Sequence, residues 1–278
     1  MKAYERLGTP GLMPTLPVLV RIDGRSFHNF TRGMTRPFDV TLRECMIATM
    51  VRLVEETNAT CGYTQSDEIT LILHSDDPKS MIWFGGKHSK IVSQSAALAT
   101  LFFFQEVQER MPDYACRNPT FDSRVFQVPN KREAVNCVIW REWDATKNSV
   151  SMAAQTAVAA HSKYGKKALH GKHQGQQMDI LMDCGINWND YPDWAKRGTY
   201  ARRKRVDRKF TESEMHLLPE KHQARKDPNL VVSRTKVVAE CLPILTTITN
   251  KEEVLFDGKE PILESGEKAG DAVESVPV

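Results

Sequence analysis

The N-terminal part of the chain carries two short apolar segments and, between them, one long amphipathic segment. Residues 17–22 and 69–73 are apolar and rich in β-branched side chains, which predicts two strands. Residues 41–44, TLRE, have the form of a capping box and predict the start of a helix that runs to about Glu56. The apolar positions of this helix recur at helical spacing: Leu42, Met46, Ile47, Met50, Leu53 and Val54. A strand, a helix and a second strand in this order place both strands in one sheet.

Acidic residues stand at the facing ends of these two strands. Asp23 and Gly24 end the first strand, and Asp67 leads into the second, 44 residues further on. If the strands are neighbours, the two carboxylates meet, and carboxylate oxygens are the hard ligands that Mg²⁺ prefers. Gly24 lacks a Cβ and lets the backbone approach a ligand or a metal closely. Spacing alone leaves the alternative that both are solvated turn acids.

Glu68 directly follows one of these candidate ligands. Alternation along a strand turns it to the opposite face from Asp67. Two interpretations stay open for Glu68: support of the loop or of a second metal through water, or a salt bridge.

The amino-acid composition limits the number of domains and the class of protein. A chain of 278 residues with 41% hydrophobic and 26% charged residues can bury one sizeable core, and one main domain is expected. No apolar stretch approaches the roughly 20 residues that cross a bilayer, and the first residues do not resemble a signal peptide, so we expect a soluble, cytoplasmic protein. Six cysteines form no CxxC pair, which favours reduced core thiols over disulfides or a zinc site.

The net charge of +3 is too small to indicate an RNA partner, but basic residues cluster. Two clusters could neutralise RNA phosphates, or form a solvated linker and helix face. The first contains Arg202, Arg203, Lys204 and Arg205, and the second contains Lys163, Lys166, Lys167 and Lys172. From about Glu212 onward the pattern is mixed and has no assigned role, and residues 251–278 are acid-rich, which predicts a mobile tail.

The amino-acid sequence around the two acids resembles that of the tRNA-histidine guanylyltransferase family. The resemblance spans about residues 15–202 and follows the family order. Its motifs are RIDGRSFHNF at 21–30, RPFD at 36–39, QSDE at 65–68, SK at 89–90, FDSRV at 121–125, WR at 140–141 and KRGT at 196–199.

The resemblance implies an α/β fold with an antiparallel polymerase-palm-like sheet, of the βαββαβ, ferredoxin-like type, with helices on one face and added C-terminal elements. We therefore expect a palm-like catalytic domain over 1–200 that includes helices at about 131–170, a basic extension over 201–250 and the tail over 251–278. Similar proteins assemble as tetramers, commonly dimers of dimers, so a homo-tetramer is expected.

The family adds nucleotides to the 5′ end of tRNA in the 3′-to-5′ direction. The resemblance implies two Mg²⁺ ions held by Asp23, Asp67 and the carbonyl of Gly24, with ATP activating the tRNA and the 3′-hydroxyl of GTP or another nucleoside triphosphate attacking. Phosphoryl transfer needs positioning and charge neutralisation rather than a covalent nucleophile, so the lack of a Ser-His or Cys-His signature is no objection.

Several residues near the acids are candidates for binding the nucleotide. Lys87 and Lys90 bracket His88 and Ser89 at a predicted helix N-terminus, which favours phosphate, although exposed lysines are also ordinary surface residues. Arg36 stands where the family usually has lysine and favours a bidentate phosphate contact. His28 could contact the nucleotide or serve packing. The full candidate set is Asp23, Gly24, Arg25, Ser26, Phe27, His28, Arg36, Ser66, Asp67, Lys87, Ser89 and Lys90.

One segment departs from the family pattern. Eukaryotic members have an HINNLYNT run where residues 146–153 read TKNSVSMA, so only Asn148 remains, with Asp144 upstream. A family KNE run reads QMD at 177–179. The loss favours the guanylyltransferase-like branch, which repairs 5′-truncated tRNAs by templated addition, and leaves nucleotide selectivity open. Two other functions remain: a palm-domain nucleotide cyclase or signalling synthase, and a catalytically inactive RNA-binding protein, against which the two acids argue.

Overall fold

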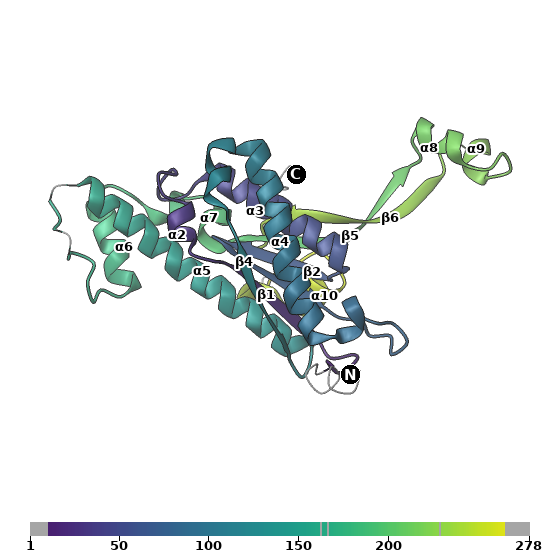
Figure 1. The fold of residues 1–278 in the computed structure, drawn as a ribbon, viewed down its shortest axis with the longest axis horizontal. Coiled ribbons are helices and arrows are strands. Elements are labelled where there is room, and N and C mark those ends of the chain that lie inside the picture. The colour runs from purple at the N-terminus through teal and green to yellow at the C-terminus, as the bar shows by residue number, and fades with distance from the viewer. Residues whose placement is uncertain (1–10, 162, 166, 228, 265–278) are drawn as a thin grey trace.

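The centre of the molecule is an antiparallel sheet of six strands (Figure 1). This computed structural model describes residues 11–161, 163–165, 167–227 and 229–264. The strand order is β4-β1-β3-β2-β5-β6. The strands are β1 (Val18–Gly24), β2 (Cys61–Gln65), β3 (Glu68–Leu73), β4 (Phe121–Gln127), β5 (Thr199–Lys209) and β6 (Val231–Glu240).

The first four strands and two helices form the expected βαββαβ unit. Helix α3 (Val40–Thr57) connects β1 to β2, and α4 (His88–Arg110) connects β3 to β4. Both helices pack on the face of the sheet that carries Val18, Val20 and Ile22, because alternate residues of a strand share a face. The prediction of an antiparallel palm-like sheet is confirmed.

The opposite face of the sheet is covered as well, by helix α5 (Lys131–Ala160). Ala134 of α5 packs with Leu19 of β1, and Val135 and Val138 pack with Ile72 of β3. The expectation of helices on one face describes the βαββαβ unit, and α5 extends it into three layers. The helix also ends at Ala160, earlier than the expected limit near 170.

Helix α3 begins earlier than the capping-box pattern predicts. Asp39 is the N-cap, and its carboxylate accepts a hydrogen bond of 2.9 Å from the Leu42 amide. The cap is therefore the aspartate of the RPFD motif, and the predicted cap residue, Thr41, lies within the first turn.

The C-terminal part adds strands to the sheet rather than a separate unit. Strands β5 and β6 pair over their full length and form a long hairpin that leaves the body and carries α8 (Glu212–Leu217) and α9 (Gln223–Lys226) at its tip (Figure 1). Strand β5 also pairs with β2, so it crosses the boundary expected at residue 200. The basic extension is thus the outer part of the palm sheet.

The segment after β6 packs against the body. Helix α10 (Lys251–Phe256) buries Val254 and Leu255 in the same cluster as Tyr200 of β5. The expected mobile tail is therefore wrong for residues 251–264. The remaining tail residues, 265–278, lie outside the described residues.

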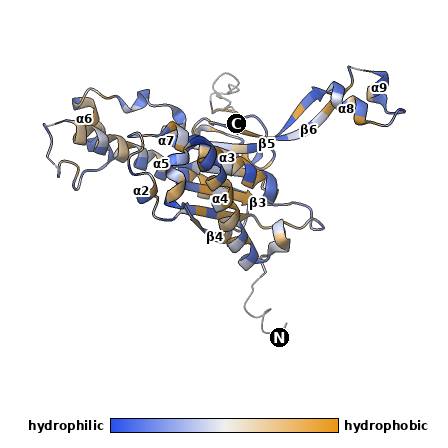
Figure 2. Ribbon diagram, turned by 45° about the horizontal axis from the view of Figure 1, so that its top comes forward, coloured by the Kyte–Doolittle hydropathy of each residue, from blue (hydrophilic) through white to orange (hydrophobic). Residues whose placement is uncertain are grey.

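The other elements are short and lie around the three layers. They are α2 (Phe27–Phe30), α6 (Gln174–Asp183), α7 (Asp193–Arg197) and the 3₁₀ turns η1 (Trp83–Gly86), η2 (Pro112–Arg117), η3 (Trp188–Asp190) and η4 (Leu245–Thr247). Apolar residues gather in the central sheet and in the helices packed on it (Figure 2). Over the described ranges, no helix combines the length and the apolar character needed to cross a membrane.

Candidate active site

The two acids meet at the ends of neighbouring strands. Asp23 lies at the end of β1, and Asp67 lies in the two-residue turn that joins β2 to β3. A backbone hydrogen bond of 3.0 Å from the Gly24 amide to the Asp67 carbonyl joins the two segments. Both side chains line one open cavity of about 420 Å³. The strand–helix–strand unit therefore brings these carboxylates together.

Uncompensated negative charge collects at this point. Burial raises the pKa of the Asp67 carboxyl and the Asp23 carboxylate raises it further, whereas hydrogen bonds from its own amide and from Ser66 lower it. The Ser66 hydroxyl donates to Asp67 Oδ1 at 3.0 Å. Within the described ranges, neither Asp23 nor Asp67 takes part in an ion pair, since the nearby arginines pair with other carboxylates.

This pair of acids fits a divalent cation. Mg²⁺ binds through one or two protein carboxylates, retains several waters and takes its other ligands from substrate phosphates. No group of three or more His, Cys, Asp or Glu side chains arranged for metal binding occurs among the described residues. A site of two carboxylates is therefore suited to Mg²⁺ with a nucleotide and unsuited to a closed zinc-type site.

Glu68 lines the same cavity as Asp23 and Asp67 and forms salt bridges there. The expectation that it faces away from Asp67 is wrong, because Asp67 lies in the turn before β3 and not in the strand. The Glu68 carboxylate accepts a hydrogen bond of 2.6 Å from Arg21 and two, of 2.6 and 3.0 Å, from Arg141 of α5. Glu68 is buried, and Arg141 also donates to Asp144 at 2.7 Å. Asn148 donates to Asp144 at 3.4 Å. Of the two interpretations of Glu68, the salt bridge is the one that the structure shows.

Gly24 is required by packing. A Cβ at this position would lie 2.4 Å from the ring of Phe27. That ring is itself fixed among aromatic neighbours, with centroid distances of 5.1 Å to Phe30, 5.4 Å to Phe103 and 5.0 Å to Phe121. Ser26, between the acid and this aromatic cluster, has a φ of 55° and opens α2. The tight turn after β1 therefore rests on the aromatic core.

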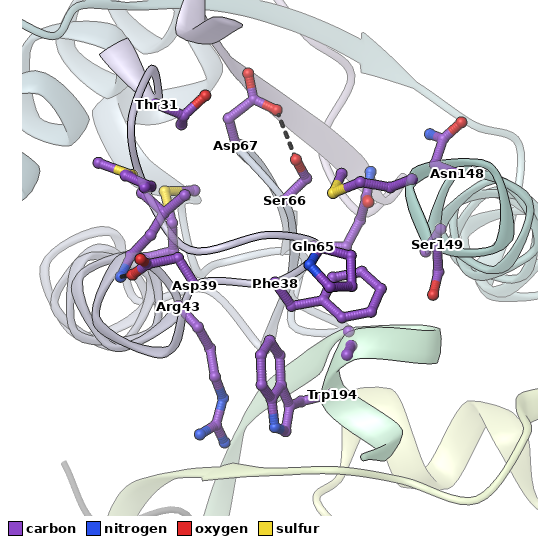
Figure 3. A pocket seen from close by; sticks show the side chains of 18 of the residues that line it. Thr31, Phe38, Asp39, Arg43, Gln65, Ser66, Asp67, Asn148, Ser149 and Trp194 are labelled. Carbon is purple, nitrogen blue, oxygen red and sulfur yellow. Dashed lines mark hydrogen bonds between the residues drawn. The ribbon is translucent and has the colours of Figure 1, made fainter. Parts of the chain in front are cut away.

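A second cavity, of about 300 Å³, adjoins the first (Figure 3). Its aromatic wall consists of Phe38 and Trp194, whose ring centroids are 6.1 Å apart, and the Arg43 guanidinium lies 4.9 Å from the Trp194 ring. The rest is lined by the polar side chains of Gln65, Ser66, Asp67, Asn148 and Ser149, together with apolar side chains that include Met34, Leu42, Met46 and Met152. The two cavities share Arg36, Gln65, Ser66, Asp67, Asn148 and Met152.

Sequence reasoning missed this aromatic wall. Phe38 lies inside the RPFD motif, so the motif itself was the available signal. Trp194 is two residues before the KRGT motif and reaches the cavity only because α7 packs beside α5 and β2. An enclosed aromatic wall with polar edges suits a planar nucleobase.

The candidate nucleotide-binding residues divide into two groups. Phe27, His28, Arg36, Ser66 and Asp67 line the second cavity, and Asp23 lines the first. Phe27 is 4% exposed, so its ring serves chiefly the aromatic core. The other candidates are absent from the lining that the structure describes for both cavities: Gly24, Arg25, Ser26, Lys87, Ser89 and Lys90.

The start of α4 lies away from the acids, which corrects the expectation that its lysines are near them. Thr100 of α4 contacts Phe121, the strand neighbour of Gly24, whereas His88 contacts the Val125 carbonyl further along β4. These two helix positions are roughly 18 Å apart at 1.5 Å per residue. Within one chain, Lys87, Ser89 and Lys90 therefore belong to the other end of the sheet.

The first basic cluster is largely engaged in the fold, which corrects its assignment to RNA. Arg202 is 0% exposed and pairs with Glu240. Arg203 donates to the carbonyls of Ala59 and Val54, and Lys204 pairs with Glu240 and Glu260. Arg205 is exposed and donates to a serine of β6. Of the second cluster, Lys163, Lys167 and Lys172 are exposed, and Lys166 lies outside the described residues.

Solved structures share this architecture. A bacterial tRNA(His) guanylyltransferase (Thg1)-like protein in complex with ATP matches with a TM-score of 0.67 and 38% identity, over 73% of this chain and 86% of that one. A similar bacterial protein in complex with GTP matches with a TM-score of 0.66 and 30% identity, over 92% and 95%. The tRNA(His) guanylyltransferase of Schizosaccharomyces pombe is 26% identical over 84% of this chain and 88% of that protein.

The βαββαβ sheet with paired acids at the ends of β1 and of the β2–β3 turn defines a palm-type nucleotidyltransferase. A model of the family described as tRNAHis guanylyltransferase matches residues 1–129, which contain both acids. This chain belongs to the tRNAHis guanylyltransferase family.

Proposed function

We propose that the protein is a Mg²⁺-dependent nucleotidyltransferase that adds nucleotides to the 5′ end of tRNA in the 3′-to-5′ direction. The observation that carries this proposal is that Asp23 and Asp67, two carboxylates without a protein counter-ion among the described residues, line one cavity, and that Asp67 also lines the adjoining one. Nucleotide phosphates with their cation supply the missing positive charge. The names of the solved relatives, which hold ATP and GTP, support the same substrate class.

Asp23, Asp67 and the Gly24 carbonyl would hold the metal. Two Mg²⁺ ions bound there would favour ionisation of an attacking hydroxyl and neutralise the leaving phosphate. The protein itself positions the reactants. Arg21 and Arg141 pair with Glu68 and not with Asp23 or Asp67, so the two aspartates keep their charge available to the metal.

The adjoining cavity would hold the nucleobase. Phe38 and Trp194 provide planar apolar surface, and Gln65, Asn148 and Ser149 provide donors and acceptors at its edges. Arg36, which lines both cavities, stands where it can contact phosphate between base and acids.

The proposed reaction has two nucleotidyl transfers. The 5′-monophosphate of the tRNA attacks the α-phosphate of ATP, which releases pyrophosphate and leaves an adenylylated end. The 3′-hydroxyl of the incoming nucleoside triphosphate then attacks the original 5′-phosphate and releases AMP, and pyrophosphate is removed from the new 5′ end. Phosphoryl transfers of this kind are accelerated mainly by positioning and charge.

Both solved bacterial relatives are named guanylyltransferase-like proteins, which supports templated 5′-end repair over guanylylation of tRNA-histidine alone. The altered 146–153 segment points to the same branch. A homo-tetramer remains a proposal, which light scattering of the purified protein tests.

The test supplies 5′-truncated tRNA, Mg²⁺ and labelled GTP or ATP. Extension of the RNA by nucleotides complementary to the opposite strand supports templated addition, and addition of G alone to full-length tRNA-histidine supports the narrower activity. A small cyclic or dinucleotide product formed without RNA would contradict the proposal and favour a palm-domain cyclase or synthase. Binding of RNA without any product in Mg²⁺ would indicate an inactive RNA-binding protein.

A further inference from the structure

An exposed tryptophan contacts the arginine that binds Glu68, and it lines neither of the two cavities described above. Trp140 of α5 is 57% exposed, which is unusual for the largest apolar side chain. The guanidinium of the next residue, Arg141, lies 4.6 Å from the centroid of its ring. That guanidinium also binds Glu68, which directly follows Asp67 in the chain and faces Asp23 in the β1–β3 register.

The flank of α5 that carries Trp140 faces the β1 and β4 side of the sheet. Cys137, one turn earlier on the same flank, packs with the cluster that contains Leu19 of β1. Asp144, one turn later, binds Arg141 and lines the cavity of the acids. Trp140 therefore lies between a residue that packs on the β1 side of the sheet and a residue that lines the cavity of the acids.

An exposed cation with one long ion pair lies on the same face of the sheet. Arg124 of β4 is the register partner of Arg21 on β1, so both project from the same face as Asp23. The Arg124 side chain is 63% exposed, and its nearest acidic contact, with Asp122, is at the 4.0 Å limit of an ion pair. An exposed pair of this kind contributes little and leaves the guanidinium available to phosphate.

We propose that Trp140 and Arg124 form a platform for the acceptor end of the RNA substrate. The open face of the indole stacks on the terminal base next to the 5′ end, and Arg124 contacts a backbone phosphate, so that the 5′-phosphate is presented to Asp23 and Asp67. Stacking on an indole accepts every base, which suits an enzyme that acts on ends of different sequence. The proposal rests on the proposed function, and both side chains act as positioning residues.

Trp143 provides a matched control on the same helix. It is 58% exposed, as much as Trp140, but it lines the groove formed with residues 246–253, which Trp140 does not line. Loss of either indole removes similar exposed surface. Of the two rings, that of Trp140 is the one that contacts Arg141, the partner of Glu68.

The probe is a hairpin RNA with a recessed 5′ end and 2-aminopurine as the terminal base, titrated with the full chain without nucleotide or Mg²⁺. We expect Trp140→Ala to weaken binding about tenfold and to abolish the fluorescence change of the probe, because one stacked base is lost. Trp140→Phe should stay within about threefold of the parent protein, and Trp143→Ala should match it. Arg124→Ala should lower the slope of log affinity against log salt by about one, and Trp140→Ala should leave that slope unchanged.

Equal affinity and equal fluorescence for Trp140→Ala and the parent protein would overturn the platform. So would a raised KM for the nucleoside triphosphate with unchanged RNA affinity, because the indole would then serve the nucleotide. Extension of the same RNA tests the proposed function separately. If the parent protein and Trp140→Ala extend the RNA equally well, the platform is refuted and the proposed function is not. A parent protein that extends no RNA, yet binds the probe through Trp140, refutes the reaction and keeps the platform.

Discussion

Arg141 and Glu68 form a buried, two-point ion pair that fastens helix α5 to the first residue of β3. The hydrogen bonds measure 2.6 and 3.0 Å, and both side chains are almost fully buried. Since Glu68 follows Asp67, this pair fixes the strand end from which the acid projects. The pair thereby links the helix layer to the geometry of the site.

Replacing Arg141 with Met should destabilise the fold by about 2–3 kcal/mol, because Glu68 stays buried with Arg21 as its remaining partner. Denaturation in urea measures the loss. Arg141→Lys, which keeps the charge but not the two-point contact, is the control and should lose less stability. Equal stability of Arg141→Met and the parent protein would contradict a structural role for the pair.

Asp67→Asn should abolish nucleotide addition, with a loss of roughly a hundredfold or more, while the variant remains folded. It should also raise the thermal midpoint measured without Mg²⁺, because the pKa of Asp67 is raised in the fold and its ionised form is therefore destabilising. The stabilisation by added Mg²⁺ that we expect for the parent protein should be absent from this variant. Asp122→Asn is the control, since Asp122 is an exposed carboxylate opposite Asp23 in the β1–β4 register.

The raised pKa of Asp67 also predicts how the binding of Mg²⁺ changes with pH. A proton and a cation compete for the same carboxylate, so the Mg²⁺ concentration for half-maximal stabilisation should rise as pH falls through the raised pKa. Thermal shifts recorded across a pH series measure this. A Mg²⁺ midpoint that stays constant from neutral to acidic pH would argue against a cation on Asp67.

Much of the fold and the position of the two acids followed from the sequence, because those features depend on local patterns. The apolar segments around Asp23 and Asp67 are short and rich in β-branched residues, and α3 between them has a clear helical period. One helix between two strands of a single sheet leaves few topologies. The acids at the strand ends then had to meet.

The remaining features depend on partners that are distant in the chain. Arg202 looks like part of a solvated basic run, yet β5 turns it inward onto Glu240, 38 residues away. Phe38 and Trp194 meet only when α7 docks beside β2. The lysines at the start of α4 face the opposite end of the sheet because α4 runs along β4, and no local pattern records that direction.

Gly24→Ala should destabilise the protein by about 1–3 kcal/mol, because its Cβ would lie 2.4 Å from the fixed ring of Phe27. Chemical denaturation tests this, and Gly165→Ala is the control, since a Cβ at position 165 would have no heavy atom of the described residues, its chain neighbours aside, within 4 Å. The additional change Phe27→Leu should recover part of the loss caused by Gly24→Ala. If Gly24→Ala unfolds with the same free energy as the parent protein, the ring of Phe27 can move to accept a Cβ, and Gly24 is not required by packing.

We expect the stability of the protein to depend on pH through Glu142. This buried carboxyl of α5 accepts hydrogen bonds from the Leu245 amide at 3.1 Å and from the Tyr200 hydroxyl at 3.5 Å. Burial raises the pKa of Glu142 to about 7 from 4.5, against lowering by the Leu245 amide, Arg197 and Tyr200. The folded state therefore binds the proton more tightly than the unfolded state.

The free energy of unfolding should accordingly fall as pH rises from about 4.5 to about 7, by up to about 3 kcal/mol at 1.36 kcal/mol per pKa unit. Glu142→Gln keeps an acceptor for Leu245 and removes the titration, so the difference in unfolding free energy between the two proteins isolates this group. Urea denaturation at pH 5, 6, 7 and 8 measures the difference, which should grow to pH 7 and then level off. Parallel stability curves for both proteins would show that Glu142 is ionised throughout and that its pKa is not raised.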